Sequence, residues 1–175
     1  MGTSKRQSKK YNSPLRIWDK PLIKRDIELK RKYGFKNKKE LWKVESELRS
    51  IRKRARDLVG LKAINVKHGE EEFIKKLNSM GLVKSDANVD NVLDLKLEDL
   101  LQRRLQTIVL KKGMAASIRE ARQLITHRHI TVGRKIIDAP SYLVKKDEEE
   151  LVDFSPGSAV SSSEHPIRSR MKKTV

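Results

Sequence analysis

The sequence contains no cysteine, few aromatic residues and no long apolar run. The absence of cysteine excludes disulfides, thiol nucleophiles, cysteine-based zinc sites and iron–sulfur clusters. No apolar stretch approaches the roughly 20 residues that a membrane-spanning helix needs, and the N-terminus lacks the apolar region of a signal peptide. Hydrophobic residues make up 37% and aromatic residues 5%, so the core must be modest and largely aliphatic. We therefore expect a soluble intracellular protein without a membrane partner.

Acidic residues are also scarce, and their scarcity is uneven along the chain. The formal net charge is +18 over 175 residues. Residues 1–62 contain 21 Lys and Arg against 7 Asp and Glu, and residues 102–146 contain 11 against 2. Such basic blocks repel themselves, and a polyanion that neutralises them removes that repulsion. The charge pattern favours nucleic acid as the partner, well ahead of an anionic membrane surface.

The hydrophobic pattern of the N-terminal half predicts helices. Residues 1–20 are basic and poor in apolar anchors, and are expected to be extended or disordered by themselves and to become ordered only against a partner. A short helix is predicted over 21–33. A long helix is predicted over 37–60, because Glu40 completes a capping-box spacing at its start and apolar residues then recur every three or four positions. The opposite face of the long helix carries predicted phosphate contacts, namely Arg49, Arg52, Lys53 and Arg56.

A third helix is predicted over 68–80. Three consecutive glutamates near its start suit the positive end of the helix dipole better than a metal site, since consecutive side chains point to different faces. The polar connector 85–94 is the expected boundary between structural units. Beyond it the pattern predicts a helix over 97–112, a helix capped by Ser117, a β-hairpin turning at Gly133 and Arg134, and short strands at 142–144 and 151–154.

The most informative stretch is 98–146, where a helix pair and a hairpin carry basic or amide side chains on each exposed element. Ser117 and the first N–H groups of its helix form a natural phosphate seat. Arg119 and Arg122 share a helix face and can grip adjacent phosphates. A compact unit of this kind can bind RNA through shape and 2′-hydroxyls, which favours RNA over DNA. The predicted contacts here are Arg103, Arg104, Ser117, Arg119, Arg122, Gln123, Thr126, His127, Arg128, Arg134 and Lys135.

Two runs in this stretch carry a family resemblance. Residues 105–113, LQTIVLKKG, and residues 117–133, SIREARQLITHRHITVG, resemble the RNA-binding domain named after the fourth small-subunit ribosomal protein. The run Ala139-Pro140-Ser141-Tyr142 is similar to the ribosomal members in particular, and the basic N-terminal helices extend the resemblance over nearly the whole chain. Bacterial members commonly have Asn-Gly where this chain has Gly133-Arg134, and the cysteine zinc knuckle of some of them cannot exist here. The short, basic chain resembles the archaeal form.

The resemblance implies an α+β fold in which a basic helical N-terminal part packs on a small RNA-binding domain of two or three helices and a short, mostly antiparallel sheet. The expected organisation is an extended basic segment over 1–20, a helical domain over 21–95, an RNA-binding domain over 96–154 and a tail over 155–175. The implied role is a structural component of the small ribosomal subunit that binds its rRNA early, nucleates assembly of the subunit body and contributes to translational accuracy. The implied partners are small-subunit rRNA and the fifth and twelfth small-subunit proteins.

The resemblance also implies a cytoplasmic, ribosome-bound protein that is not a homo-oligomer and uses no cofactor. A metal site is not expected either, because His127 and His129 have no third ligand nearby in the sequence. Three alternatives stay open: a non-ribosomal RNA-binding factor built on the same domain, a DNA-packaging protein, and an enzyme that carries the domain as an appendage. The enzyme is disfavoured because the basic domain holds only two acidic residues over 102–146 and no catalytic domain follows it.

Overall fold

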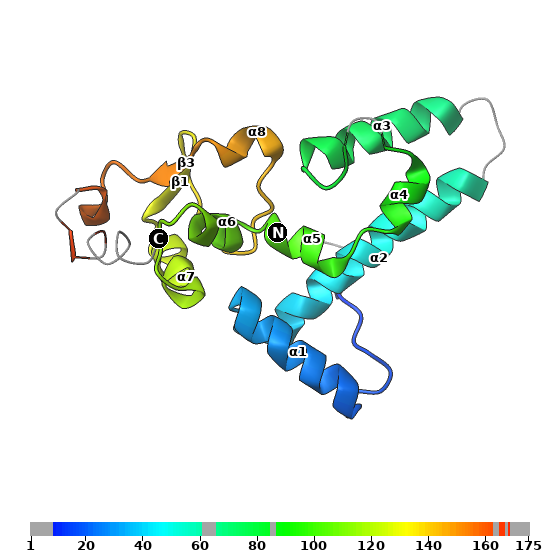
Figure 1. Cartoon of the computed structure of the whole chain (residues 1–175), viewed down its shortest axis with the longest axis horizontal. Coiled ribbons are helices and arrows are strands. Elements are labelled where there is room, and N and C mark those ends of the chain that lie inside the picture. Colours follow the sequence, from blue (N-terminus) through cyan, green and yellow to red (C-terminus); the bar gives the residue numbers. More distant parts are fainter. Residues whose placement is uncertain (1–8, 61–65, 85–86, 163–164, 167, 169–175) are drawn as a thin grey trace, which may run out of the picture.

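The computed structural model describes residues 9–60, 66–84, 87–162, 165–166 and 168 (Figure 1). The predicted segment 1–20 and tail 155–175 therefore lie partly outside the described residues. Helices dominate the described part, together with a small antiparallel sheet of three strands, which confirms the predicted α+β class. Among these helices, none combines the length and apolar composition needed to cross a membrane.

Helices α1 (Lys20–Tyr33) and α2 (Lys38–Gly60) form close to the predicted bounds. α1 ends at Gly34, which adopts a left-handed φ of 63° and donates its N–H to the carbonyl of Lys30. α2 has 23 residues and extends over about 35 Å as the longest rod in Figure 1. Its predicted apolar face is buried through Leu41, Val44, Leu48 and Ala55.

The chain before α1 packs against α2. Residues 9–19 contain neither helix nor strand. The Tyr11 ring stacks on Trp42 with 6.0 Å between ring centroids, and the N–H of Asn12 donates to the Ser46 hydroxyl at 3.0 Å. Trp42 is thus half-buried under the N-terminal segment and contributes to its placement.

The polar connector expected over 85–94 contains a helix instead. After α3 (Val66–Ser79), helix α4 (Val89–Leu93) buries Val89 and Val92 in the same core as α2. Five residues are too few to show a helical period, and the intervening Asp and Asn side chains make the stretch look like a loop in sequence. The connector thus packs in the core of the first unit, inside the predicted helical domain 21–95, and does not form the polar loop expected for it.

The prediction of a single helix over 97–112 is also wrong. The structure has two helices there, α5 (Leu97–Gln102) and α6 (Leu105–Lys111). Arg104 is extended at the break and pairs with Leu143 in an isolated antiparallel bridge. The N–H of Leu105 donates to the carbonyl of Tyr142 at 2.8 Å, and that of Val144 donates to Arg103 at 3.0 Å. The strand expected over 142–144 is reduced to this one bridge.

The capped helix and the hairpin form as predicted. Helix α7 (Ile118–Thr126) leads into strands β1 (Ile130–Val132) and β2 (Lys135–Ile136), which pair Val132 with Lys135 across the turn. Strand β3 (Val152–Phe154) pairs on the other side of β1, so the strand order is β2-β1-β3. Helix α8 (Lys146–Glu149) precedes β3, and a 3₁₀ turn (Ala159–Ser161) follows it. A second core lies between α6, α7 and this sheet.

The two cores meet where α1 ends. The first core includes Leu101 and the second begins with Leu105. At the junction the Gln106 side-chain amide donates to the carbonyls of Ile118 at 2.7 Å and of Gly34 at 3.4 Å. A Cβ on Gly34 would lie 2.6 Å from the Gln106 amide nitrogen and 2.9 Å from a carbon of Ile118. Glycine therefore allows both the left-handed turn and the close approach of the two units.

Replacing Gly34 with alanine is expected to destabilise the protein by about 2–4 kcal/mol, because a left-handed alanine is strained and its methyl group overpacks the junction. The free energy of unfolding in urea measures this. The matched control is Gly157→Ala, since a Cβ there meets nothing within 4 Å. Equal stability of the two variants would contradict the close junction.

Candidate nucleic-acid interface

Ser117 caps the start of α7 as predicted, while the Glu120 side chain bonds to the residue before the cap rather than to Ser117 itself. The Ser117 hydroxyl accepts a hydrogen bond from the N–H of Glu120 at 3.2 Å, and the Glu120 carboxylate accepts one from the N–H of Ala116 at 2.8 Å. These bonds fix the entry of the helix, so that Arg119 and Arg122 are presented in its first two turns. Arg119 is exposed, and the structure shows no ion pair for it within the described residues.

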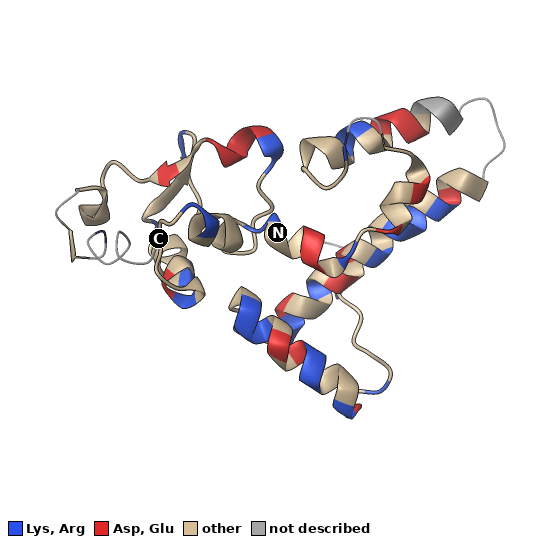
Figure 2. Ribbon diagram, in the orientation of Figure 1, with Lys and Arg blue, Asp and Glu red and all other residues tan. Residues whose placement is uncertain are grey.

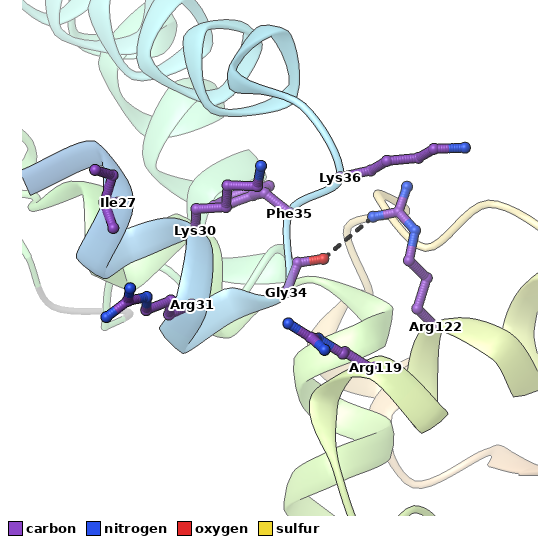
Figure 3. Close-up of a pocket in the computed structure, with 8 residues that line it drawn as sticks. All are labelled: Ile27, Lys30, Arg31, Gly34, Phe35, Lys36, Arg119 and Arg122. Atoms are coloured by element: carbon purple, nitrogen blue, oxygen red, sulfur yellow. Dashed lines mark hydrogen bonds between the residues drawn. The ribbon is translucent and has the colours of Figure 1, made fainter. Parts of the chain in front are cut away.

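A cleft of about 520 Å³ lies between the end of α1, the turn after it and the start of α7 (Figure 3). Arg119 and Arg122 extend from α7 toward the turn at Gly34. The cleft is lined by five cations, Lys30, Arg31, Lys36, Arg119 and Arg122, together with Ile27, Gly34 and Phe35. The structure thus brings two predicted arginines together with three cations that the sequence reasoning did not single out. The basic last turn of α1, directly before a glycine stop, is the signal that was available for them.

Arg122 is 23% exposed and is held at the side of this cleft. Its Nη1 donates to the carbonyl of Gly34 at 3.3 Å and to Glu40 Oε2 at 3.1 Å. Its Nη2 donates to Glu40 Oε1 at 2.7 Å, so the pair is bidentate. Arg122 therefore joins α7 to the start of α2 as well as facing the cleft.

Arg104 is buried, and the expectation that it is an exposed contact is wrong. Its side chain is 1% exposed, lies over the Phe35 ring at 4.4 Å from the centroid and approaches Glu40 Oε2 at 3.5 Å. Burial lowers the pKa of the Arg104 guanidinium from its ordinary value, while Glu40 acts in the opposite direction. The residue turns inward because it is the extended residue at the α5–α6 break rather than a position on a helix surface.

Glu40 therefore pairs with two arginines and does not fill the capping role expected for it. Burial by itself raises the pKa of Glu40, but the hydrogen bonds from Arg122 and the charges of Arg122 and Arg104 outweigh it and hold the pKa below its ordinary value of 4.5. A carboxyl with a depressed folded pKa contributes stability that is present above the unfolded pKa and is lost as pH falls through the folded one.

Stability is accordingly expected to fall as pH drops below about 4.5, and Glu40→Gln is expected to flatten this part of the pH profile. The two profiles can be compared by urea unfolding across the acidic range. A Glu40→Gln profile with the same slope as that of the parent chain would show that another carboxyl is responsible.

Arg103 is also used within the protein. Its Nη1 contacts a carboxylate oxygen of Glu149 at 2.5 Å, and its Nε and Nη2 donate to the carbonyl of Val144. With its side chain 15% exposed, Arg103 fastens the α5–α6 break to the segment before α8. The expectation of an exposed side chain is therefore wrong for Arg103 too.

Comparison with known proteins finds one matching domain family and relatives that align over most of the chain. The model of the S4 domain matches residues 103–150, beginning at the helix break. Small ribosomal subunit protein uS4 of Hyperthermus butylicus is 47% identical over 158 residues, 90% of each chain. That of Methanococcus aeolicus is 45% identical over 172 residues, 96% of each chain, and that of Nanoarchaeum equitans is 41% identical over 170 residues, 96% of this chain and 94% of that one. The chain belongs to the uS4 family. The predicted resemblance is confirmed.

The remaining predicted contacts of this uS4 chain lie on exposed positions of α7 and the hairpin. Gln123, Thr126, His127, Arg128, Arg134 and Lys135 are all exposed. Thr126 donates its hydroxyl to the carbonyls of Arg122 at 3.0 Å and Gln123 at 3.1 Å, within the last turn of α7. Arg128 adopts a φ of 62° and lies 3.6 Å from an Asp138 oxygen. His129 Nδ1 lies 2.7 Å from the Ser158 hydroxyl, which gives that histidine a structural role.

The cations predicted on α2 lie in a different place. A second hollow of about 560 Å³ is lined by Arg49, Arg52 and Arg56, with Lys96 and the Arg25 that pairs with Glu45. Arg52 donates to the carbonyl of Leu95 at 2.6 Å, so it partly serves the fold. Lys53 is exposed. The structure therefore separates the α2 set from the α7 set, since neither hollow is lined by cations of both helices.

Acidic side chains gather on the opposite side of the S4 domain. α8 carries Asp147, Glu148 and Glu149, and it lies at the far edge of the domain from α7 (Figure 2). The α7 edge faces the C-terminal end of α1, where the ribbon is coloured blue by the basic last turn of that helix. Among the described residues, no three His, Asp or Glu side chains are close enough to hold a metal ion. The domain is thus polarised, with its positive edge toward the N-terminal helices.

Proposed function

We propose that this uS4 protein is a structural component of the small ribosomal subunit and binds small-subunit rRNA in the cleft between α1 and α7. The observation that carries the proposal is that five cations from two separately packed units line one cleft. A net charge of +18 and membership of the uS4 family support it. The role is structural rather than catalytic.

The cleft suits phosphate groups of an RNA backbone. Arg119 and Lys36 are exposed and line the cleft together with Arg122. Contacts of this kind position the backbone without reading sequence, while RNA is distinguished by its shape and its 2′-hydroxyls. Gln123 lies on the next exposed turn of α7, where an amide can reach a ribose hydroxyl or a base edge. The exposed Arg134 and Lys135 extend the positive surface onto the hairpin.

The hollow on α2 provides a second anchoring point. Arg49 and Arg56 are exposed there, and Lys96 closes the hollow from the start of α5. A second stretch of rRNA backbone bound in this hollow would make the affinity of the whole chain exceed that of the S4 domain by itself. The bridging of two units also suits a protein that binds rRNA early and nucleates assembly of the subunit body.

The finer aspects of the role rest on the family resemblance. The protein acts in the cytoplasm, within the ribosome, and is not a homo-oligomer. It contacts the fifth and twelfth small-subunit proteins and contributes to translational accuracy. The main alternative remains a non-ribosomal RNA-binding factor on the same domain. Co-sedimentation with intact small subunits separates the two roles, because the alternative factor would not remain with washed subunits.

The RNA-binding proposal is tested by competition. Purified full-length protein is bound to labelled small-subunit rRNA and challenged with unlabelled rRNA or with duplex DNA of equal phosphate content. The proposal predicts that rRNA competes at least about tenfold better, since a cleft shaped for RNA adds to the common electrostatic attraction. Equal competition would instead support the DNA-packaging alternative.

A further inference from the structure

The carboxylate of Glu40 lies next to the cationic cleft. By simple electrostatics, a negative charge in this position disfavours the binding of RNA. Glu40 is bonded to Arg122, which lines the cleft, and approaches Arg104, which is buried behind it. A negative charge at this place repels a phosphate and neutralises part of an arginine that could bind one. The effect of Glu40 on the geometry of Arg122 accounts for a carboxylate in this position.

The pairing uses only one edge of the Arg122 guanidinium. Nη1 donates to Glu40 and to the Gly34 carbonyl, and Nη2 donates to Glu40. These two nitrogens form the end-on edge of the guanidinium group. A guanidinium has five N–H donors, so the Nε donor and the second Nη2 donor remain on the side edge. For these two donors the structure shows no acceptor among the described residues. A parallel pair of N–H groups is the geometry that binds a phosphate in bidentate fashion.

Charge balance explains why the arrangement depends on Glu40. Two guanidinium groups share this one carboxylate, and Nε, Nη1 and Nη2 of Arg104 have no hydrogen-bond partner in the described part of the chain. Without Glu40, the buried Arg104 would lose its counter-ion and would repel Arg122. Arg122 would then be free to leave the Gly34 turn for solvent.

We propose that Glu40 is a positioning residue for rRNA binding: it fixes Arg122 by its end-on edge so that the side edge is presented to a phosphate in the cleft. The inference rests on the proposed function of the cleft. It has an uncommon consequence, because removal of a negative charge from an RNA-binding surface then weakens the binding of RNA.

The test compares Glu40→Gln with Glu98→Gln in full-length protein on small-subunit rRNA. Glu98 is an exposed carboxylate that pairs with Lys32, so its replacement changes net charge equally. We expect Glu40→Gln to weaken binding about tenfold and to lower the log–log salt slope by about one phosphate contact. Glu98→Gln is expected to leave binding unchanged or slightly tighter. Unchanged or tighter binding by folded Glu40→Gln overturns the proposal.

Loss of folding is separated from loss of positioning by a second variant. Glu40→Gln combined with Arg104→Met removes the buried cation together with its counter-ion, which restores charge balance in the core. If Glu40 positions Arg122, this variant recovers thermal stability but still binds rRNA weakly. Recovery of full affinity together with stability would show that Glu40 only neutralises Arg104, and would overturn the proposal.

A double-mutant cycle with Arg122 tests whether Glu40 affects RNA binding through Arg122. In an Arg122→Ala background, Glu40→Gln should cause no further loss of affinity, because the residue that Glu40 positions is gone. A further tenfold loss would overturn the proposal. Arg119→Ala tests the cleft independently of Glu40. If Arg119→Ala binds rRNA normally, the proposed function of the cleft is wrong. If Arg119→Ala binds weakly but Glu40→Gln binds normally, only the proposed role of Glu40 is wrong.

Discussion

Reversing the charge at Arg119 is expected to weaken rRNA binding about 100-fold at fixed salt. Arg119 is exposed in the first turn of α7 and lines the cleft, where the helix dipole and the charge of Arg119 would act together on a phosphate of the proposed RNA. A charge-assisted hydrogen bond contributes about 1.5–3 kcal/mol, and glutamate adds repulsion to that loss. Equilibrium binding of Arg119→Glu measures the effect, and circular dichroism confirms the fold.

The matched control is Lys146→Glu on α8, which makes the same change in net charge on the acidic side of the domain. It is expected to alter affinity less than about threefold, because screening limits the effect of an exposed charge distant from the RNA. Equal losses in the two variants would mean that net charge, rather than the cleft, determines binding.

Raising the salt concentration from about 50 to about 200 mM is expected to weaken rRNA binding by about 10³–10⁵, as neutralisation of on the order of 6–10 phosphates requires. The five cations of the cleft and the exposed cations of the α2 hollow can make contacts in that range. Arg49→Ala and Arg56→Ala should each reduce the log–log slope by about one contact if the hollow binds RNA.

The slope measured over several salt concentrations tests both parts of this expectation. A steep slope that does not change in Arg49→Ala and Arg56→Ala would place the RNA on the cleft and hairpin alone. A slope near zero would be incompatible with binding through phosphates and would contradict the assignment of the basic blocks to RNA.

Local features of this fold could be predicted from the sequence because their causes are local. The Ser117 cap and its Glu120 partner lie within four residues, and the change from a helical to an alternating pattern at Ile130 marks the first strand. The break at Arg103 and Arg104 could not be predicted. Leu101 and Leu105 remain in helical phase across it, and the carbonyl of Tyr142 that pairs with the break is distant in sequence.

The composition of the site depended on contacts that no local pattern contains. Arg122 meets Glu40 across 82 positions, and only this contact shows that its charge is shared with the protein. Arg104 looked like an exposed cation because lysine and arginine are seldom buried without a partner, and its partner lies on α2. The cations at the end of α1 were not selected because their neighbour, α7, is brought to them by the junction at Gly34.

Directed cleavage of rRNA from a single attachment site tests the central claim that RNA lies in the cleft between α1 and α7. The chain has no cysteine, so one introduced cysteine can carry an iron chelate that generates hydroxyl radicals. Asn37→Cys places the probe on an exposed position beside Lys36 at the cleft, and Asp147→Cys places it on α8. We predict strong, localised cleavage of bound small-subunit rRNA from position 37 and little from position 147. Strong cleavage from position 147 with none from position 37 would contradict the account.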